Sequence, residues 1–389
     1  MTSTIAAGVN ATPRSHHPLA RSVAGYGLEG FGAEAPPSAP GPDWRMLAAE
    51  LVDQRLTGLA VAAAQEGWLP LEDDQAADLL ERHRGAMLWV LSIERTLVAL
   101  DEAFNEAGID YLVLKGPALA RTFYPDPSLR AFGDLDLLIR GSDWERACTL
   151  LPALGFTRQH PESRPGFVDS FGKAAVHTDG TGLELDLHRR LVVGRYGLAV
   201  DTDELFENPA WCRVGARWVR TLDDGLMFVH ACMHAALGHR NPRLLPLRDV
   251  LQVAASDGID WDAVAERVER WSLKAVVGHA VPTAAALLGA RPAHEAASLA
   301  ASLAPSRRER RWLDAYTTGR RGRGGTALGT LSAIPSVRGK SAYAAALLFP
   351  SREFVEARTR SRGFASYLAR WKVPLRWLSG RSGFGRQRP

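Results

Sequence analysis

Short apolar segments bounded by turn residues predict a group of strands in the middle of the chain. Four such segments lie at 111–114, 135–139, 173–177 and 183–191. The last two flank the turn sequence DGTG, so we expect them to pair as a hairpin. Before and after this group, within 43–107 and from 223 onwards, apolar residues recur at helical spacing. The pattern therefore predicts a chain in which helices precede and follow the strands.

Two aspartates, Asp134 and Asp136, stand at the start of the apolar run that ends at Ile139. Their spacing places both side chains on one face of a strand, with backbones about 6–7 Å apart. Such carboxylates can converge on a hard divalent cation, and without a cation they would repel one another and resist burial. The alternative is a strand that begins at a sheet edge with both aspartates in water, because a D-x-D motif is only three residues long. The sequence leaves both interpretations open.

A lysine, a glycine and an arginine near this strand are candidates for phosphate binding. Lys115 and Gly116 follow the first predicted strand, and Pro117 suits the first turn of a helix. A lysine and exposed backbone N–H groups at such a turn suit a phosphate, although an ordinary surface lysine fits the pattern equally well. Arg130 lies four residues before Asp134 and either pairs with the carboxylates or binds phosphate oxygens.

The last predicted strand carries a polar face made of Glu184, Asp186 and His188. A half-exposed strand with a polar face is a common alternative. A third carboxylate on an adjacent strand is nevertheless what a two-metal site requires. Asp186 is therefore a candidate third metal ligand.

The order and spacing of these motifs resemble the uncharacterised nucleotidyltransferase family of the polymerase-beta-like superfamily. The resemblance rests on Lys-Gly, an arginine shortly before G-D-x-D, a helix ending in Leu-Gly-Phe, h-D-h-H and a later histidine-rich helix, and it covers about residues 80–260. It implies an α/β (α+β) fold: a small mixed sheet with N-terminal helices and a C-terminal helical domain. Most of the superfamily has Gly-Ser or Gly-Gly at the turn, where this chain has Lys115-Gly116 followed by a longer, Pro-containing insert.

The resemblance implies an Mg²⁺-dependent nucleotidyltransferase that moves a nucleoside monophosphate from a triphosphate, such as ATP, to an acceptor and releases pyrophosphate. Gly116 matches the glycine of the phosphate-side turn, and Lys115 and Arg130 would steady the triphosphate oxygens. The catalytic acids that hold two Mg²⁺ ions are matched by Asp134, Asp136 and Asp186. The acceptor stays open among a small molecule, a peptide or protein side chain, and a nucleic acid end.

On this basis the chain divides into five predicted regions. They are a disordered leader at 1–42, a helical prelude packed on the catalytic domain at 43–107, the nucleotidyltransferase catalytic sheet at 108–221, a helical domain at 222–318, and a basic, partly disordered C-terminal region at 319–389. The leader is rich in Ala, Gly, Pro and Ser without a continuous apolar core, so we do not expect it to be a signal peptide.

The first helix after the strands places His230 and His234 one turn apart, with His239 beyond them and Asp249 on the next helix. An H-x-x-x-H pair can hold zinc, but Ala231 stands where the H-E-x-x-H motif of metallohydrolases has its glutamate. The other possible roles are hydrogen bonds across a helix pair and a contribution to the acceptor pocket. The sequence does not decide between these roles.

Composition places the chain among ordinary globular proteins, because 46% of its 389 residues are hydrophobic and 23% are charged. The three cysteines, Cys148, Cys212 and Cys232, lack metal-binding spacing and are too few for a disulfide framework. Their scarcity favours a reducing compartment, so we expect a cytoplasmic protein. No segment has about 18 or more uninterrupted apolar residues, so we expect no transmembrane helix.

Two other functions fit the sequence. A catalytically silent module of the same fold would bind a nucleotide without turnover. A nucleic-acid-binding protein would act through the arginine-rich C-terminal tail, which also carries Trp371 and Trp377. The net charge is only +4, so a solvated, partly disordered tail is the simpler interpretation of these arginines.

Overall fold

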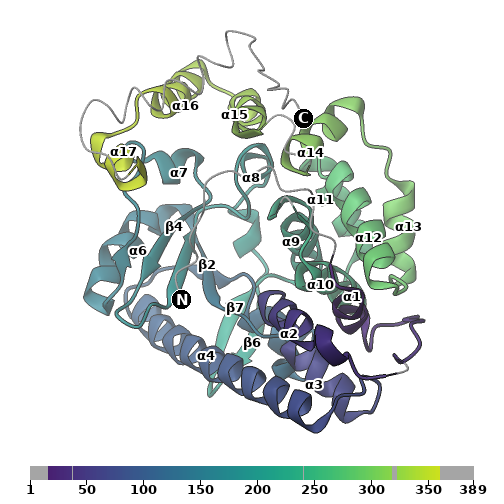
Figure 1. Ribbon diagram of the computed structural model, residues 1–389. Coiled ribbons are helices and arrows are strands. Elements are labelled where there is room, and N and C mark those ends of the chain that lie inside the picture. The colour runs from purple at the N-terminus through teal and green to yellow at the C-terminus, as the bar shows by residue number, and fades with distance from the viewer. Residues whose placement is uncertain (1–15, 37, 240, 318–321, 360–389) are drawn as a thin grey trace, which may run out of the picture.

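The computed structural model describes residues 16–36, 38–239, 241–317 and 322–359. A mixed sheet of seven strands is surrounded by helices that precede, interrupt and follow it in the sequence (Figure 1). The predicted α/β fold is therefore confirmed. The strands are β1 (Tyr111–Val113), β2 (Asp134–Ile139), β3 (Thr157–Arg158), β4 (Ala174–Thr178), β5 (Glu184–His188), β6 (Ala210–Val214) and β7 (Arg217–Thr221).

The strands follow the order β3-β4-β5-β2-β1-β7-β6 across the sheet. Two neighbouring pairs, β2 with β5 and β1 with β7, are parallel, and the other pairs are antiparallel. The predicted hairpin is present as β4 and β5. Since β2 has β1 on one side and β5 on the other, the aspartates of its first half lie inside the sheet and not at its edge.

Four helices come before the sheet. They are α1 (Pro18–Gly25), α2 (Trp44–Asp53), α3 (Thr57–Gln65) and α4 (Asp73–Glu106). The long helix α4 begins at a capping box, in which Glu72 and Gln75 bond to each other's backbone N–H groups, and it runs beside the sheet (Figure 1). A disordered leader was expected over 1–42. This expectation is wrong for α1, because the helix buries Ala20, Val23 and Ala24. Residues 1–15 lie outside the described residues.

Shorter helices connect the strands, and a helical region follows them. The connecting helices are α5 (Pro117–Thr122), α6 (Trp144–Leu150), α7 (Phe167–Phe171) and α8 (Arg195–Ala199), with short 3₁₀ turns at Gly41–Asp43, Pro127–Leu129, Gly141–Asp143, Leu151–Leu154 and Glu204–Phe206. The later helices are α9 (Asp224–Leu237), α10 (Leu244–Ala254), α11 (Trp261–Arg270), α12 (Lys274–Leu288), α13 (His294–Ser302), α14 (Arg307–Thr317), α15 (Gly322–Ala333), α16 (Val337–Leu348) and α17 (Arg352–Thr359).

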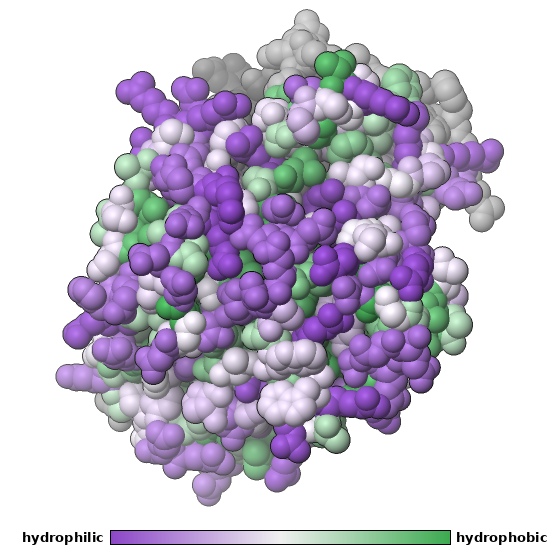
Figure 2. Space-filling view, turned by 180° about the vertical axis from the view of Figure 1, so that it is seen from behind, coloured by the Kyte–Doolittle hydropathy of each residue, from purple (hydrophilic) through white to green (hydrophobic). Residues whose placement is uncertain are grey.

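One cluster of buried apolar side chains extends from Ala20 to Leu313 and includes the sheet and the helices on both sides of it. The predicted boundaries near 107 and 221 therefore fall inside one packed unit. Hydrophobic residues on the face shown in Figure 2 lie singly or in small groups among hydrophilic ones. Among the described residues, no helix is both long enough and apolar enough to cross a membrane. The three cysteines are free thiols, and Cys212 and Cys232 are buried.

Candidate functional site

The acidic residues meet where β2 and β5 run side by side. The parallel register places Asp134 opposite Glu184, Asp136 opposite Asp186, and Leu138 opposite His188. Alternation along β2 turns the intervening Leu135 and Leu137 into the core, where both are fully buried. The two strands are therefore adjacent, as the sequence requires for a shared site, although they are about 50 residues apart along the chain.

Asp136, Asp186 and His188 form a compact cluster of possible metal ligands. One ligand atom from each residue lies within 4.8 Å of the other two. His188 Nε2 is 2.9 Å from Asp136 Oδ1 and 3.9 Å from Asp186 Oδ2. His188 and Asp136 are buried, whereas Asp186 is partly exposed. Two carboxylate oxygens and an imidazole nitrogen are a donor set that divalent cations accept.

The hydrogen bonds of His188 indicate that a cation fits between these residues. Its Nδ1 lies 3.0 Å from the backbone carbonyl oxygen of Arg190, and its Nε2 lies 2.9 Å from the Asp136 carboxylate. Both oxygens only accept, so the ring satisfies both contacts only as an imidazolium. Burial and the charge of Lys173 lower the pKa of His188, which favours the neutral ring. A neutral ring that donates from Nδ1 to the carbonyl presents a bare Nε2, the usual arrangement of a metal-binding histidine.

Two lysines face the same carboxylates. Lys115 Nζ lies 2.9 Å from Asp136 Oδ2, and Lys173 Nζ lies 3.9 Å from Asp186 Oδ2. Burial alone would lower the pKa of Lys115, but Asp136 and Asp134 raise it above its ordinary value. Burial, together with the charge of Lys115, lowers the pKa of Lys173. These ammonium groups supply the positive charge that the buried aspartates need when no metal is bound.

The two central aspartates differ in their electrostatics. Burial alone would raise the pKa of Asp136, but the charge of Lys115 holds it well below its ordinary value. Burial raises the pKa of Asp186, and the negative charge of Asp136 adds to this rise. Asp136 is therefore a carboxylate across the physiological pH range, whereas Asp186 takes up a proton more readily. Carboxyl groups whose pKa values are pushed apart in this way suit different chemical roles.

Asp134 lies beside this cluster and is bound by an arginine from the N-terminal helices. Arg55 donates from its guanidinium to Asp134 Oδ1 at 3.1 Å. The guanidinium packs against Gly133, where a Cβ would come within 2.8 Å of it and would displace the arginine. Asp134 is not part of the close ligand cluster of Asp136, Asp186 and His188.

The turn after β1 brings Lys115 to the site. Gly116 has a φ of 51° and a ψ of −112°, a conformation that glycine adopts readily and other residues do not, and α5 begins at Pro117 as expected. The N–H of Ala118 donates to the carbonyl oxygen of Lys115, and Pro117 has no N–H to offer. The group at this turn that could bind a phosphate is therefore the ammonium of Lys115, more than the backbone of the short helix α5.

Arg130 forms a buried ion pair with Asp249, next to the turn that carries Lys115. Its Nε and NH2 donate to the two carboxylate oxygens of Asp249 at 2.7 and 2.8 Å, and Tyr124 donates to the same carboxylate at 2.8 Å. The NH1 group donates to the carbonyl oxygen of Gly116 at 3.2 Å. The Arg130 side chain is only 5% exposed. Its position favours a role in holding the Lys115–Gly116 turn, in place of the direct phosphate contact expected from the sequence.

Helix α9 brings its histidines near the acidic cluster. Burial and the charge of Lys115 lower the pKa of His230 to about 3, and burial and Lys115 also hold the pKa of His234 well below its ordinary value. Neither histidine belongs to a group of metal ligands among the residues that the structure describes, which gives the zinc alternative no support. Asp249 contacts Arg130 and Tyr124, so its role is structural.

The sequence analysis did not identify Arg55 and Lys173 as site residues. Lys173 precedes β4, and its carbonyl accepts from the N–H groups of Arg189 and Arg190, which fixes it beside the end of β5. The hairpin prediction and the rarity of lysine in the chain were its available signals. His188 could be found from its place on the face of Asp186. No local signal marks Arg55, because its contact with Asp134 depends on the tertiary packing of the helices.

A family model matches the part of the chain that contains these residues. The family described as "Uncharacterised nucleotidyltransferase" matches residues 40–289. A crystal structure of an antigenic nucleotidyltransferase-like protein from Paracoccidioides brasiliensis is similar to 52% of this chain and 94% of that chain, at 13% identity and a TM-score of 0.31, which supports no conclusion about this protein. No curated protein matches the sequence. Because the family match covers more than half of the chain and includes the acidic cluster, the protein belongs to this uncharacterised nucleotidyltransferase family.

Proposed function

We propose that the protein is an Mg²⁺-dependent nucleotidyltransferase that moves a nucleoside monophosphate from a triphosphate, such as ATP, to an acceptor and releases pyrophosphate. The observation that carries the proposal is the convergence of Asp136, Asp186 and His188 within 4.8 Å of one another, flanked by Lys115 and Lys173. Anionic ligands for a metal and cationic groups for phosphates are the two requirements of this chemistry.

Asp136, Asp186 and His188 would hold one divalent ion. Asp134 is the further carboxylate for a second ion, as the family resemblance implies, once it leaves Arg55. Such ions, when bound, neutralise charge at the α-phosphate and activate the attacking group. His188 keeps its ring orientation through its Nδ1 hydrogen bond to the Arg190 carbonyl.

The residues of the chain then account for the remaining steps. Lys115 and Lys173 bind oxygens of the triphosphate after they separate from the aspartates. An oxygen or nitrogen of the acceptor forms a bond to the α-phosphorus, the bond from that phosphorus to the oxygen bridging the β-phosphate breaks, and pyrophosphate leaves. The proton of the acceptor passes to Asp186, which is the partly exposed carboxylate of the cluster. Arg130 acts indirectly, because it holds the turn of Lys115 through Gly116 and Asp249.

The proposal is tested by incubating the protein with each labelled nucleoside triphosphate and Mg²⁺, followed by mass analysis of the protein and of candidate acceptors. We expect one acceptor to gain the mass of a nucleoside monophosphate in a metal-dependent manner. Triphosphate binding without transfer to any acceptor would instead support a silent nucleotide-binding module.

We expect Asp186→Asn to reduce transfer by about a hundredfold or more, the scale of losing a group that fixes a metal. Glu184→Gln should change transfer by less than about threefold, because Glu184 lies on the same face of β5 but outside the ligand cluster. Steady-state transfer rates of the two variants measure the difference. Equal and mild effects would mean that Asp186 is not the third acid of the site.

Lys115→Met should weaken triphosphate binding by about 1.5–3 kcal/mol, the scale of a hydrogen bond to a charged group. Because Lys115 also pairs with buried Asp136, we expect the variant to melt at a lower temperature without metal, unlike a surface lysine. Calorimetric titration with a non-hydrolysable triphosphate and Mg²⁺ gives the affinity. Lys274→Met removes a lysine outside the site, paired with Glu269, and serves as the control. Equal affinities in all three proteins would remove Lys115 from the phosphate site.

A further inference from the structure

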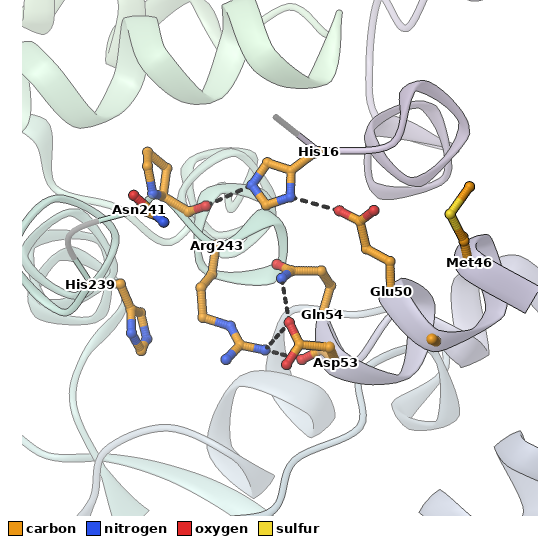
Figure 3. Close-up of a pocket in the computed structure, with 10 residues that line it drawn as sticks. His16, Met46, Glu50, Asp53, Gln54, His239, Asn241 and Arg243 are labelled. Carbon is orange, nitrogen blue, oxygen red and sulfur yellow. Dashed lines mark hydrogen bonds and ion pairs between the residues drawn. The ribbon is translucent and has the colours of Figure 1, made fainter. Parts of the chain in front are cut away.

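A cavity of about 670 Å³, lined mostly by polar and charged residues, opens between α2 and the segment that joins α9 to α10. Figure 3 shows Met46 and Glu50 of α2 on one side of it and His239 and Arg243 on the other. Its volume is within the range of small-molecule sites, which is about 300–1,000 Å³. No residue of this cavity belongs to the acidic cluster described above.

The walls of the cavity are held by contacts between segments far apart in the sequence. His16 Nδ1 lies 2.8 Å from Glu50 Oε1, and its Nε2 lies 2.8 Å from the carbonyl oxygen of Pro242. Gln54 donates to Asp53 Oδ2 at 2.8 Å and accepts from the N–H of Leu244 at 2.9 Å. The cavity is therefore formed before any ligand enters, as small-molecule sites usually are.

Arg55 connects this cavity to the acidic cluster. It directly follows the lining residue Gln54, adopts a left-handed φ of 59° that is unusual for a residue other than glycine, and binds Asp134. Burial and the charge of Arg243 lower the pKa of His239, another lining residue, to about 4. A ligand in the cavity would therefore contact Gln54, which directly precedes the arginine bound to Asp134.

The charges on the cavity walls indicate which ligand fits. Glu50 and Asp53 contribute two carboxylates, and the Asp53 side chain is 66% exposed, so its charge faces an incoming molecule. Arg243 contributes one positive charge, 3.4 Å from Asp53, the ring of His16 lies 2.8 Å from Glu50, and His239 is neutral at pH 7. The lining therefore lacks the cluster of unpaired positive charges that a triphosphate or a nucleic acid backbone requires, and its carboxylates favour hydroxyl or amino groups that donate hydrogen bonds.

We propose that this cavity binds the acceptor, and that the acceptor is a small uncharged or cationic molecule that carries hydroxyl or amino groups. The inference rests on the proposed nucleotidyl transfer and names its substrate class. Lys115 and Lys173 hold the triphosphate at the acidic cluster, and the acceptor approaches from the side of Arg55 with its hydroxyl or amino group toward the α-phosphorus. Its oxygen or nitrogen forms the new bond and loses a proton as pyrophosphate departs.

The test is label transfer from α-labelled triphosphate to a panel made of spermidine, ethanolamine, glucosamine, glycerol, a single-stranded oligonucleotide and casein. Ala49 lies on the exposed side of α2 and lines the cavity, so Ala49→Trp fills the space without disturbing the core. Val52 is 45% exposed on the same helix and does not line the cavity, which makes Val52→Trp the matched control.

We expect the wild type and Val52→Trp to label a small amine or polyol, and Ala49→Trp to lose about tenfold or more of this transfer while its metal-dependent affinity for the triphosphate is kept. Full transfer by Ala49→Trp, or labelling of only the oligonucleotide or casein, would overturn the inference and leave the nucleotidyltransferase proposal standing. If the wild type labels no member of the panel and releases no pyrophosphate, both proposals are contradicted.

Discussion

Replacing Asp136 by asparagine is expected to reduce nucleotidyl transfer by about a hundredfold or more, the range found when groups that fix a metal or transition-state charge are removed. Asp136 is 2% exposed as a side chain, and it contacts both Lys115 and His188 at 2.9 Å. An amide cannot neutralise the ammonium of Lys115 or bind a divalent ion as strongly as a carboxylate. The change should also lower the melting temperature without metal, because it leaves the ammonium of Lys115 buried without its closest partner.

Transfer rate and melting temperature of the purified variant check this expectation. Asp78→Asn is the control, because Asp78 of α4 pairs with Arg82, and an asparagine there can still accept the hydrogen bond from Trp44. A folded Asp136→Asn protein with the transfer rate of the wild type would contradict the assignment of the metal site.

Asp249→Ala is expected to lower the free energy of unfolding by about 3–5 kcal/mol, the scale of breaking one partner out of a buried ion pair. The guanidinium of Arg130 would lose two hydrogen bonds in a place that water does not reach, and Tyr124 would lose its acceptor. Denaturant titration of the full chain gives the change in stability.

Two further variants serve as comparisons for the stability of Asp249→Ala. Glu269→Ala, which breaks an exposed pair with Lys274, should lower the stability by only a small fraction of that amount. The double replacement Arg130→Met with Asp249→Leu should be more stable than Asp249→Ala, because no buried charge is left without a partner. An equally small effect of Asp249→Ala and Glu269→Ala would show that the ion pair does not stabilise the fold.

The strands that carry the site could be predicted because their signals are local. Alternation of apolar and polar residues marks β2 and β5, and the turn DGTG marks the β4–β5 hairpin. Helix α1 was not predicted, because it is short and small residues form its buried face. Its packing against α10 and α12 could not be inferred from composition. The parallel direction of β2 and β5 could not be predicted, since no short turn joins these strands; only their adjacency was expected, from the carboxylates of a shared metal site.

The contacts of the site depend on residues far apart in the sequence. Arg130 and Asp249 are 119 residues apart, and Arg55 and Asp134 are 79 residues apart. From the sequence, an arginine near two carboxylates is interpreted as their partner or as a phosphate ligand. Only the tertiary structure shows that Asp249 binds Arg130 and that Arg55 binds Asp134. The repulsion expected within the Asp134–Asp136 pair is offset in the same way, by Arg55 and Lys115.

The most direct test of nucleotidyl transfer compares ATP labelled at the α-phosphate with ATP labelled at the γ-phosphate, each incubated with the protein, Mg²⁺ and an acceptor. The account predicts that the α-label becomes attached to the acceptor and that the γ-label leaves as pyrophosphate. Transfer of the γ-label to the acceptor, or its release as orthophosphate, would contradict the account, because the bond broken would then lie between the β- and γ-phosphates.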